Sequence, residues 1–175
     1  MAEPSLALLK TIGALDTFGA WSGKTVAWLI LPLVFSLTYE GFARYLFNAP
    51  TLWAYDLSYM LYGSHFMLGA GYALVNKSHI RTDFFYAKWS VRRQGLIDVV
   101  IYLFFFFPGI FFFFLAGFDA AQHAWSIQEK SDASAWRPII YPFKTVMPVT
   151  AALLMLQGVS EFIKSVYAAR TGRWL

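Results

Sequence analysis

Long apolar blocks are the feature that most restricts what this chain can fold into. Four of them, at residues 25–47, 57–75, 95–118 and 145–163, have about the 20 residues with which a helix crosses a bilayer. They do not alternate polar and apolar faces as the helices of a soluble protein do. Hydrophobic residues make up 58% of the chain and aromatic residues 20%, which is typical of membrane proteins. The sequence therefore predicts an all-α integral membrane protein with four transmembrane helices, in preference to a soluble helical bundle.

Basic residues are distributed unevenly among the connecting segments. Segment 48–56 has no Lys or Arg, whereas segment 76–94 is strongly basic. Its basic residues are Lys77, Arg81, Lys88, Arg92 and Arg93. Lys and Arg concentrate in cytoplasmic loops, so we predict that segment 76–94 and both termini are cytoplasmic. The cytoplasmic bias of Lys and Arg then accounts for the formal net charge of +4, which gives no support to nucleic-acid binding.

The first 24 residues differ from the spans that follow. They mix Leu and Ile with Lys10, Asp16 and Lys24, which predicts an amphipathic helix on the membrane surface, with a frayed tail as the alternative. They lack the apolar core and cleavage site of a signal peptide, so we expect them to remain in the mature protein. The predicted organisation is an N-terminal segment at 1–24, a membrane domain at 25–167 and a cytoplasmic tail at 168–175.

Few residues are suited to cofactor chemistry. The chain has no cysteine, which excludes disulfides and thiolate metal sites. Its three histidines, His65, His79 and His123, fall at three different depths of the predicted bundle, so we do not expect a haem. The third span contains FFFFPGIFFFF, in which Pro108 predicts a bend, and the Phe side chains have no polar atom to orient a ligand. We therefore predict no cofactor and no metal.

Glu40 and Arg44 are the charged residues that an apolar span least easily accommodates. They are four residues apart, so they lie on one helix face in the order that favours an ion pair. Arg44 is close enough to the end of the span to reach the outer interface, whereas Glu40 lies deeper and needs a partner or a proton. One interpretation is a proton-coupled site. The other, which we favour, is a polar tie with Asp56 that fixes helix packing or a protein interface.

Other features of the spans indicate packing. In the second span, Gly69 and Ala73 form a pair of small residues that permits close helix approach. In the fourth span, Gln157 and Glu161 share a face, and Lys164 follows three residues after Glu161. Neither group resembles the broken helices of a transport site.

Three sequence blocks occur in a distinctive order. The first is RYLFNAP at 44–50, followed by Trp53 and Asp56; the second is HIRTDFFY at 79–86; the third is EKSDASAWRPIIYPFKTVMPVTAALLMLQG at 129–158. In this order and spacing the chain resembles the small membrane subunit, of the DctQ type, of tripartite ATP-independent periplasmic (TRAP) transporters. Asp56 is a departure, since the corresponding position is often glutamate in that family.

The resemblance implies a function without enzymatic activity. Small subunits of this type have four membrane helices in the bacterial inner membrane and accompany a large permease subunit that carries the substrate and sodium sites. A periplasmic binding protein delivers an organic acid to the outer face. The resemblance therefore implies a scaffold subunit for sodium-driven uptake of an organic acid, with the large permease subunit, the binding protein and membrane lipids as partners.

The resemblance also gives expectations for single residues. Glu40, Arg44 and Asp56 would form the polar tie, within this subunit or toward the large one. A second group, at the inner membrane boundary, would cap a helix and contact lipid headgroups, in preference to binding a metal. Its residues are His79, Arg81 and Asp83. A third group would belong to an outer surface for the binding protein. Its residues are Trp53, Glu129, Ser131, Trp136 and Lys144.

Two functions of other classes compete with this one. A self-contained, proton-coupled four-helix exporter would use Glu40 as its carrier carboxylate. The long polar stretch at 119–145 and the neighbouring Arg44 argue against it. A membrane anchor for a redox enzyme would require a haem, for which the histidines are poorly placed.

Overall fold

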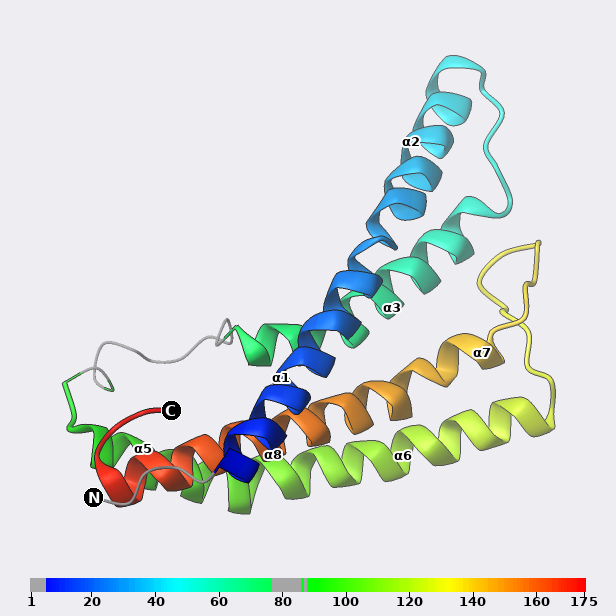
Figure 1. Ribbon diagram of the computed structural model, residues 1–175. Coiled ribbons are helices and arrows are strands. Elements are labelled where there is room, and N and C mark those ends of the chain that lie inside the picture. The colour runs from blue at the N-terminus through cyan, green and yellow to red at the C-terminus, as the bar shows by residue number, and fades with distance from the viewer. Residues whose placement is uncertain (1–5, 77–85, 87) are drawn as a thin grey trace.

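The computed structural model describes residues 6–76, 86 and 88–175, and its regular elements there are helices (Figure 1). In chain order they are α1 (Leu6–Ala27), α2 (Ile30–Leu46), α3 (Ala54–Val75), α5 (Val91–Ile101), the π-helical η1 (Tyr102–Phe106), α6 (Phe107–Ser126), α7 (Tyr141–Lys144) and α8 (Val146–Thr171). This confirms the all-α prediction for the described residues. Helix α8 is central, because α1, α3, α5 and α6 all pack against it.

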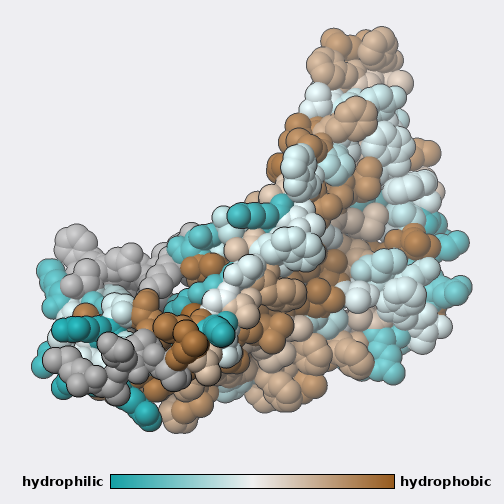
Figure 2. All heavy atoms as spheres, viewed as in Figure 1, coloured by the Kyte–Doolittle hydropathy of each residue, from teal (hydrophilic) through white to brown (hydrophobic). Residues whose placement is uncertain are grey.

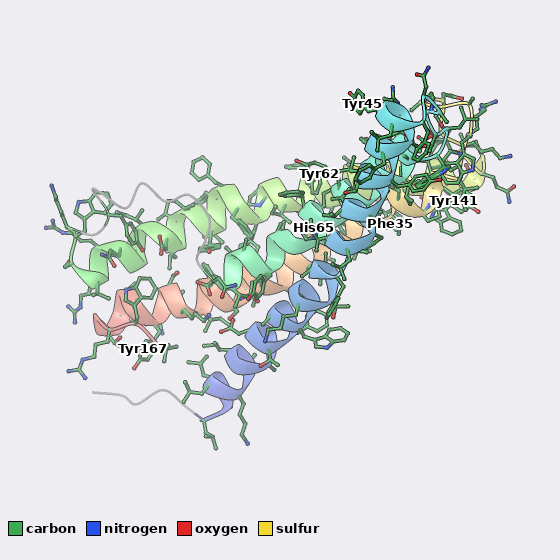
Figure 3. The ribbon with its side chains drawn as sticks, turned by 90° about the horizontal axis from the view of Figure 1, so that it is seen from above. Phe35, Tyr45, Tyr62, His65, Tyr141 and Tyr167 are labelled. Carbon is green, nitrogen blue, oxygen red and sulfur yellow. The ribbon has the colours of Figure 1, made fainter. Side chains whose placement is uncertain are left out.

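The connecting segments define two ends of the molecule. Segments 47–53 and 127–140 lie at one end, which we call the loop end, and Tyr45 and Tyr141 lie there as well (Figures 1 and 3). The start of α5 and the end of α8 lie at the opposite end, near Tyr167. We call it the basic end. Its described basic residues are Lys88, Arg92, Arg93, Arg170 and Arg173.

Three helical stretches in the described residues are long and apolar enough to cross a membrane. They are Leu6–Leu46, Val91–Ser126 and Tyr141–Thr171, with 41, 36 and 31 residues. The first combines the predicted segment 1–24 with the predicted span 25–47. Helix α3 corresponds to the predicted span 57–75; its 22 residues reach about 33 Å, enough for a bilayer, but it is not among these three stretches. The count of four spans therefore stays a prediction.

Large apolar side chains lie on the outside of the bundle. Phe105 is 71% exposed and Phe112 is 68% exposed, while many of the fully buried positions are Ser or Ala. Figure 2 shows apolar residues over the lower middle and the upper tip of one face, with hydrophilic residues mostly at its left and right edges and a few near its centre. Such a large exposed apolar surface is unfavourable in water and suits a hydrocarbon solvent.

The junction of α1 and α2 is a tight turn at Trp28 and Leu29. Pro32 has no N–H, so the carbonyl of Trp28 cannot receive its usual bond from four residues ahead. It accepts instead from Leu31 N at 3.2 Å, and regular bonding resumes with Leu33 N to Leu29 O at 3.2 Å. The helix is therefore interrupted at the turn that Pro32 imposes, just after the predicted boundary at residues 24 and 25, which stays a prediction. The first helix also does not stand apart from the others, because it packs on α3 and α8.

The predicted irregularity at Pro108 takes the form of a π-helical stretch. The N–H of Phe107 donates to the carbonyl of Tyr102, five residues back, directly before the proline. A wider turn relieves the crowding that a proline ring causes in the preceding α-turn. The helical stretch also runs from Val91 to Ser126, beyond the predicted 95–118, so part of the predicted polar stretch after residue 118 is helical.

Close packing around α8 depends on glycine. A Cβ at Gly95 would lie 2.5 Å from Ala169 N and 2.8 Å from Ser165 O, so α5 approaches the backbone of α8 directly. Ala168 on the facing turn is fully buried. Helix α8 itself ends at Thr171, eight residues beyond the predicted end of the last span at 163. Gly172 follows, and its φ of 74° gives the left-handed cap common after helices.

Candidate interface sites

Both carboxylate oxygens of Glu40 accept hydrogen bonds at the loop end of α2. One of its oxygens, Oε1, accepts from Arg44 Nε at 2.8 Å and also from Arg44 Nη2. The other oxygen, Oε2, accepts from Thr51 N at 2.9 Å and from the Thr51 hydroxyl. The predicted Glu40 and Arg44 pair is therefore formed in the structure. It fastens the segment after α2 back onto the helix.

Segment 47–53 supports this arrangement by its backbone. Asn48 adopts a φ of 55°, which asparagine tolerates better than most residues, and the chain reverses so that Ala49 N bonds Ala43 O at 2.9 Å. Trp53 follows, and its ring packs on Tyr39 with centroids 5.6 Å apart. Trp53 is thus held against the outer part of α2.

Asp56 belongs to a different cluster. It lies in the first turn of α3, where the helix dipole favours a carboxylate, and it is only 2% exposed. Its Oδ1 accepts from Ser131 Oγ at 2.5 Å, and its Oδ2 accepts from the Ser134 hydroxyl. The two serine oxygens in turn accept the N–H groups of Ala133 and Trp136, each at 3.2 Å. Asp56 therefore anchors segment 127–140, 75 residues away, to the start of α3.

Segment 127–140 is also closed by its own contacts. Lys130 and Ile139 form an isolated antiparallel bridge, with Ile140 N to Glu129 O at 3.0 Å beside it. The Lys144 ammonium donates to both oxygens of Glu129 at 2.6 Å, and both side chains are about a third exposed. The segment is thus a fixed loop on the loop end, tied to α3 by Asp56 and to α7 by Lys144.

The three residues of the predicted polar tie do not meet. Glu40 and Arg44 are together, whereas the carboxylate of Asp56 bonds the serines of segment 127–140. Trp136 is 47% exposed on that segment, and Ser131 is 4% exposed beneath it. The predicted inner group lies outside the described residues. Its members are His79, Arg81 and Asp83.

A second ionic cluster lies between α1 and α8 and was not predicted. Asp16 Oδ1 accepts from Gln157 Nε2 at 2.9 Å and from Ser160 Oγ at 2.6 Å, and Asp16 Oδ2 lies 2.7 Å from Lys164 Nζ. The same ammonium lies 2.6 Å from Glu161 Oε1. The sequence shows the α8 side of this cluster, because Gln157, Glu161 and Lys164 share one side of the last span. It does not show that their partner is Asp16 on α1.

No group of three or more His, Cys, Asp or Glu side chains that could hold a metal occurs in residues 6–76, 86 and 88–175. Of the described histidines, His65 lies on α3 and bonds the Val26 carbonyl through Nδ1 at 3.3 Å, while His123 lies in the last turn of α6. The polar clusters found here join helices to one another and to loops.

Long apolar helices, an apolar exterior and polar clusters that join elements define a multi-pass membrane protein. Comparison with known families gives the class of transporter. The family described as tripartite ATP-independent periplasmic transporters, DctQ component, matches residues 33–167, and the chain belongs to this family. DctQ is a transporter-component family and not an enzyme family, and its members are small membrane subunits that work with a large permease and a binding protein. No curated protein shows significant similarity to the chain.

Proposed function

We propose that this chain is the scaffold subunit for sodium-driven uptake of an organic acid. A large permease subunit would carry the substrate and sodium sites, and a periplasmic binding protein would deliver the acid. The protein would lie in the bacterial inner membrane with the basic end in the cytoplasm and the loop end in the periplasm. The observation that carries the proposal is the family match over residues 33–167, which includes α3, α5, α6 and nearly all of α2 and α8.

The loop end is the surface on which the binding protein would dock. Two fixed segments, 47–53 and 127–140, are available there, and each is fastened by buried or half-buried polar contacts. Trp53, Glu129, Trp136 and Lys144 would be part of this surface, while Ser131 would hold it from below through Asp56. A preformed surface supports docking because little conformational freedom is lost on association.

Glu40 and Arg44 would contribute to contact with the large subunit. Glu40 is saturated by Arg44 and Thr51, but the Arg44 side chain is 54% exposed and presents its guanidinium at the end of α2. Helix α2 packs along α3, and its other side is largely exposed, including Phe35 and Phe42. An apolar helix side with a cation at its end suits a membrane partner with a carboxylate near the outer interface.

Reconstitution tests the proposal. Proteoliposomes containing this chain, its large subunit and the binding protein should take up the organic acid when an inward sodium gradient is imposed. Uptake should fall to background when this chain is omitted. Full uptake by the large subunit and binding protein alone would contradict the scaffold function.

The exporter alternative makes the opposite prediction. It requires transport by this chain alone, driven by a pH gradient and abolished by Glu40→Gln. The family match does not favour it, and the contacts of Glu40 with Arg44 and Thr51 suit a fixed tie. Proton-coupled transport by the isolated chain would therefore overturn the scaffold proposal.

A further inference from the structure

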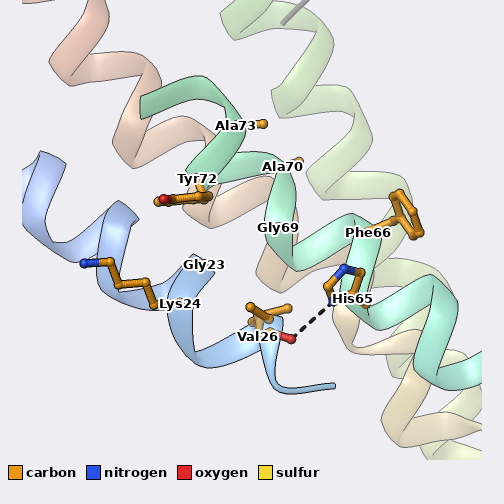
Figure 4. Close-up of a pocket in the computed structure, with 10 residues that line it drawn as sticks. Gly23, Lys24, Val26, His65, Phe66, Gly69, Ala70, Tyr72 and Ala73 are labelled. Carbon is orange, nitrogen blue, oxygen red and sulfur yellow. Dashed lines mark hydrogen bonds between the residues drawn. The ribbon is translucent and has the colours of Figure 1, made fainter. Parts of the chain in front are cut away.

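A groove of about 500 Å³ lies between α1 and α3 (Figure 4). Its lining includes Gly23, Lys24, His65, Phe66, Gly69 and Ala73. A Cβ added to Gly69 would meet no atom within 4 Å, so the space beside it is open. Apart from Lys24 and His65, the named residues are apolar or small.

A hydrogen bond between α3 and α1 crosses the groove at one end. His65 Nδ1 and the Val26 carbonyl, 3.3 Å apart, bridge α3 and α1 beside the turn at Trp28 (Figure 4). From His65 to Tyr72 the groove runs along α3 for about 10 Å, toward the basic end. This is less than the roughly 15 Å depth of one leaflet of the hydrocarbon core. A transmembrane helix needs a path through both leaflets, whereas a single lipid chain needs only one.

The end of the groove opposite the His65 bridge carries a cation, Lys24, although its ammonium points away from Gly69 and Ala73 in Figure 4. Lys24 is exposed at the rim, and the neighbouring Gly23 packs so closely on Tyr72 that a Cβ there would lie 2.2 Å from Tyr72 Cβ. Tyr72 is three residues from the end of α3 at Val75, or about 4.5 Å along the axis. Lys24 therefore lies beside the end of α3 that faces the basic end, which the orientation in the proposed function places near the cytoplasmic boundary of the membrane. Anionic lipids are the complement of basic surfaces on that side of a membrane.

We propose that this groove binds one anionic phospholipid. The first part of one acyl chain would lie along Gly69, Ala70 and Ala73, up to the bridge between His65 and Val26. The phosphate would lie beside the Lys24 ammonium. The order of features along the groove, a cation at one end and then a floor of small residues, matches the order of headgroup and chain in a lipid of one leaflet. The lipid would fill the space between α1 and α3 and hold the N-terminal helix on the bundle.

The proposal can be tested by adding two lipids of identical chains, dioleoyl phosphatidylglycerol and dioleoyl phosphatidylcholine, to the delipidated full chain and measuring the bound lipid by native mass spectrometry. The wild type should bind one phosphatidylglycerol in preference to phosphatidylcholine. Lys24→Gln should lower that preference roughly fivefold, the usual effect of one basic residue near an anionic headgroup. Lys10→Gln, at an exposed lysine of the same helix outside the groove, should leave it unchanged.

Filling the groove should abolish binding of either lipid. The Cβ of Gly69→Leu would meet no atom within 4 Å, so we expect the side chain to enter the open space and the fold to be retained. Gly109→Leu on α6 is the matched control, because Gly109 also has open space around it and does not line the groove. Equal retention of the two lipids, or retention that survives Gly69→Leu, would overturn the proposal.

The complex with the large subunit gives an independent measurement. The bound phosphatidylglycerol should remain when the two subunits are purified together. Loss of the lipid on assembly would mean that a protein segment occupies the groove, and the proposal would be wrong while the scaffold function stood. Failure of the subunits to purify together would instead count against the scaffold function.

Discussion

Two ionic clusters in this chain, one at the loop end and one between α1 and α8, are built in opposite ways. Glu40, Arg44 and Thr51 lie within 11 residues of sequence, and Arg44 is 54% exposed. Asp16 and Lys164 come from the first and last helices, and the Lys164 side chain is only 12% exposed. The first cluster ties the segment after α2 back onto that helix. The second joins the first helix of the chain to the last.

The difference predicts different energetic consequences. An exposed pair gains little, because solvent screens it and both side chains lose freedom. A buried pair is costly to assemble, but once assembled it cannot lose one member without leaving an uncompensated charge. Lys164 serves two carboxylates, those of Asp16 and Glu161, so it is the member whose loss leaves the most charge uncompensated.

Replacing Lys164 should therefore have the largest effect. Lys164→Met keeps the length of the side chain and removes its charge, leaving two carboxylates close together. We expect the free energy of unfolding to fall by about 3 kcal/mol, the lower part of the range for broken buried pairs. Thermal unfolding in detergent, followed by size-exclusion chromatography, measures it. Lys10→Met, at an exposed lysine of α1, is the control and should change little.

A compensating variant distinguishes charge from packing. Asp16→Asn and Glu161→Gln, added to Lys164→Met, remove the charges that the lysine balanced. Most of the lost stability should return. If the triple variant is as unstable as Lys164→Met alone, the cluster acts through side-chain packing and the electrostatic explanation is wrong.

The sequence predicted contacts between residues that are close along the chain, and it missed contacts between residues that are far apart. Glu40 and Arg44 were identified because helix geometry places residues four apart on one face. Asp56 was assigned to the same tie because it is close to them in sequence, yet its partners Ser131 and Ser134 lie 75 and 78 residues away. No local pattern encodes a contact of that range, since it depends on how α3 and segment 127–140 pack.

The same reasoning applies to the helices. The predicted spans and their ends stay predictions, and the helices run beyond them because amphipathic turns continue a helix past its apolar core, as in α8 up to Thr171. Asp16 was read as the polar face of a surface helix, because its partners were 141 to 148 residues further along the chain. Pro108 was recognised as a break, although only the structure gives its π-helical form.

Asp56→Ala should have the next largest effect and should act at the loop end. It leaves Ser131 and Ser134 without their acceptor, and charge-assisted bonds of this kind support a loss of about 2 kcal/mol. We expect faster amide hydrogen exchange in segment 127–140 and unchanged exchange at the contact of α1 with α8. Equal acceleration at both places would mean that the Asp56 contacts and the cluster between α1 and α8 are not independent.

Glu129→Gln should have a smaller effect on the same segment. The bridge to Lys144 is about a third exposed, so its loss should cost about 1 kcal/mol at most. A double-mutant cycle with Lys144→Met isolates the pair, because the coupling should vanish once either charge is gone. A coupling as large as the effect of Asp56→Ala would place the main anchor of the segment at α7.

Arg44→Ala should have the smallest effect on stability and a measurable effect on assembly. Glu40 keeps its two bonds from Thr51, so the end of α2 should remain folded. If Arg44 contacts the large subunit, the variant should lower recovery of that subunit in a pull-down by severalfold, whereas Arg170→Ala at the basic end should not. Equal recovery with the two variants would show that Arg44 serves α2 alone. An exposed pair contributes little to folding. A loss of recovery without a loss of stability in Arg44→Ala would therefore identify the loop-end cluster as a contact between subunits.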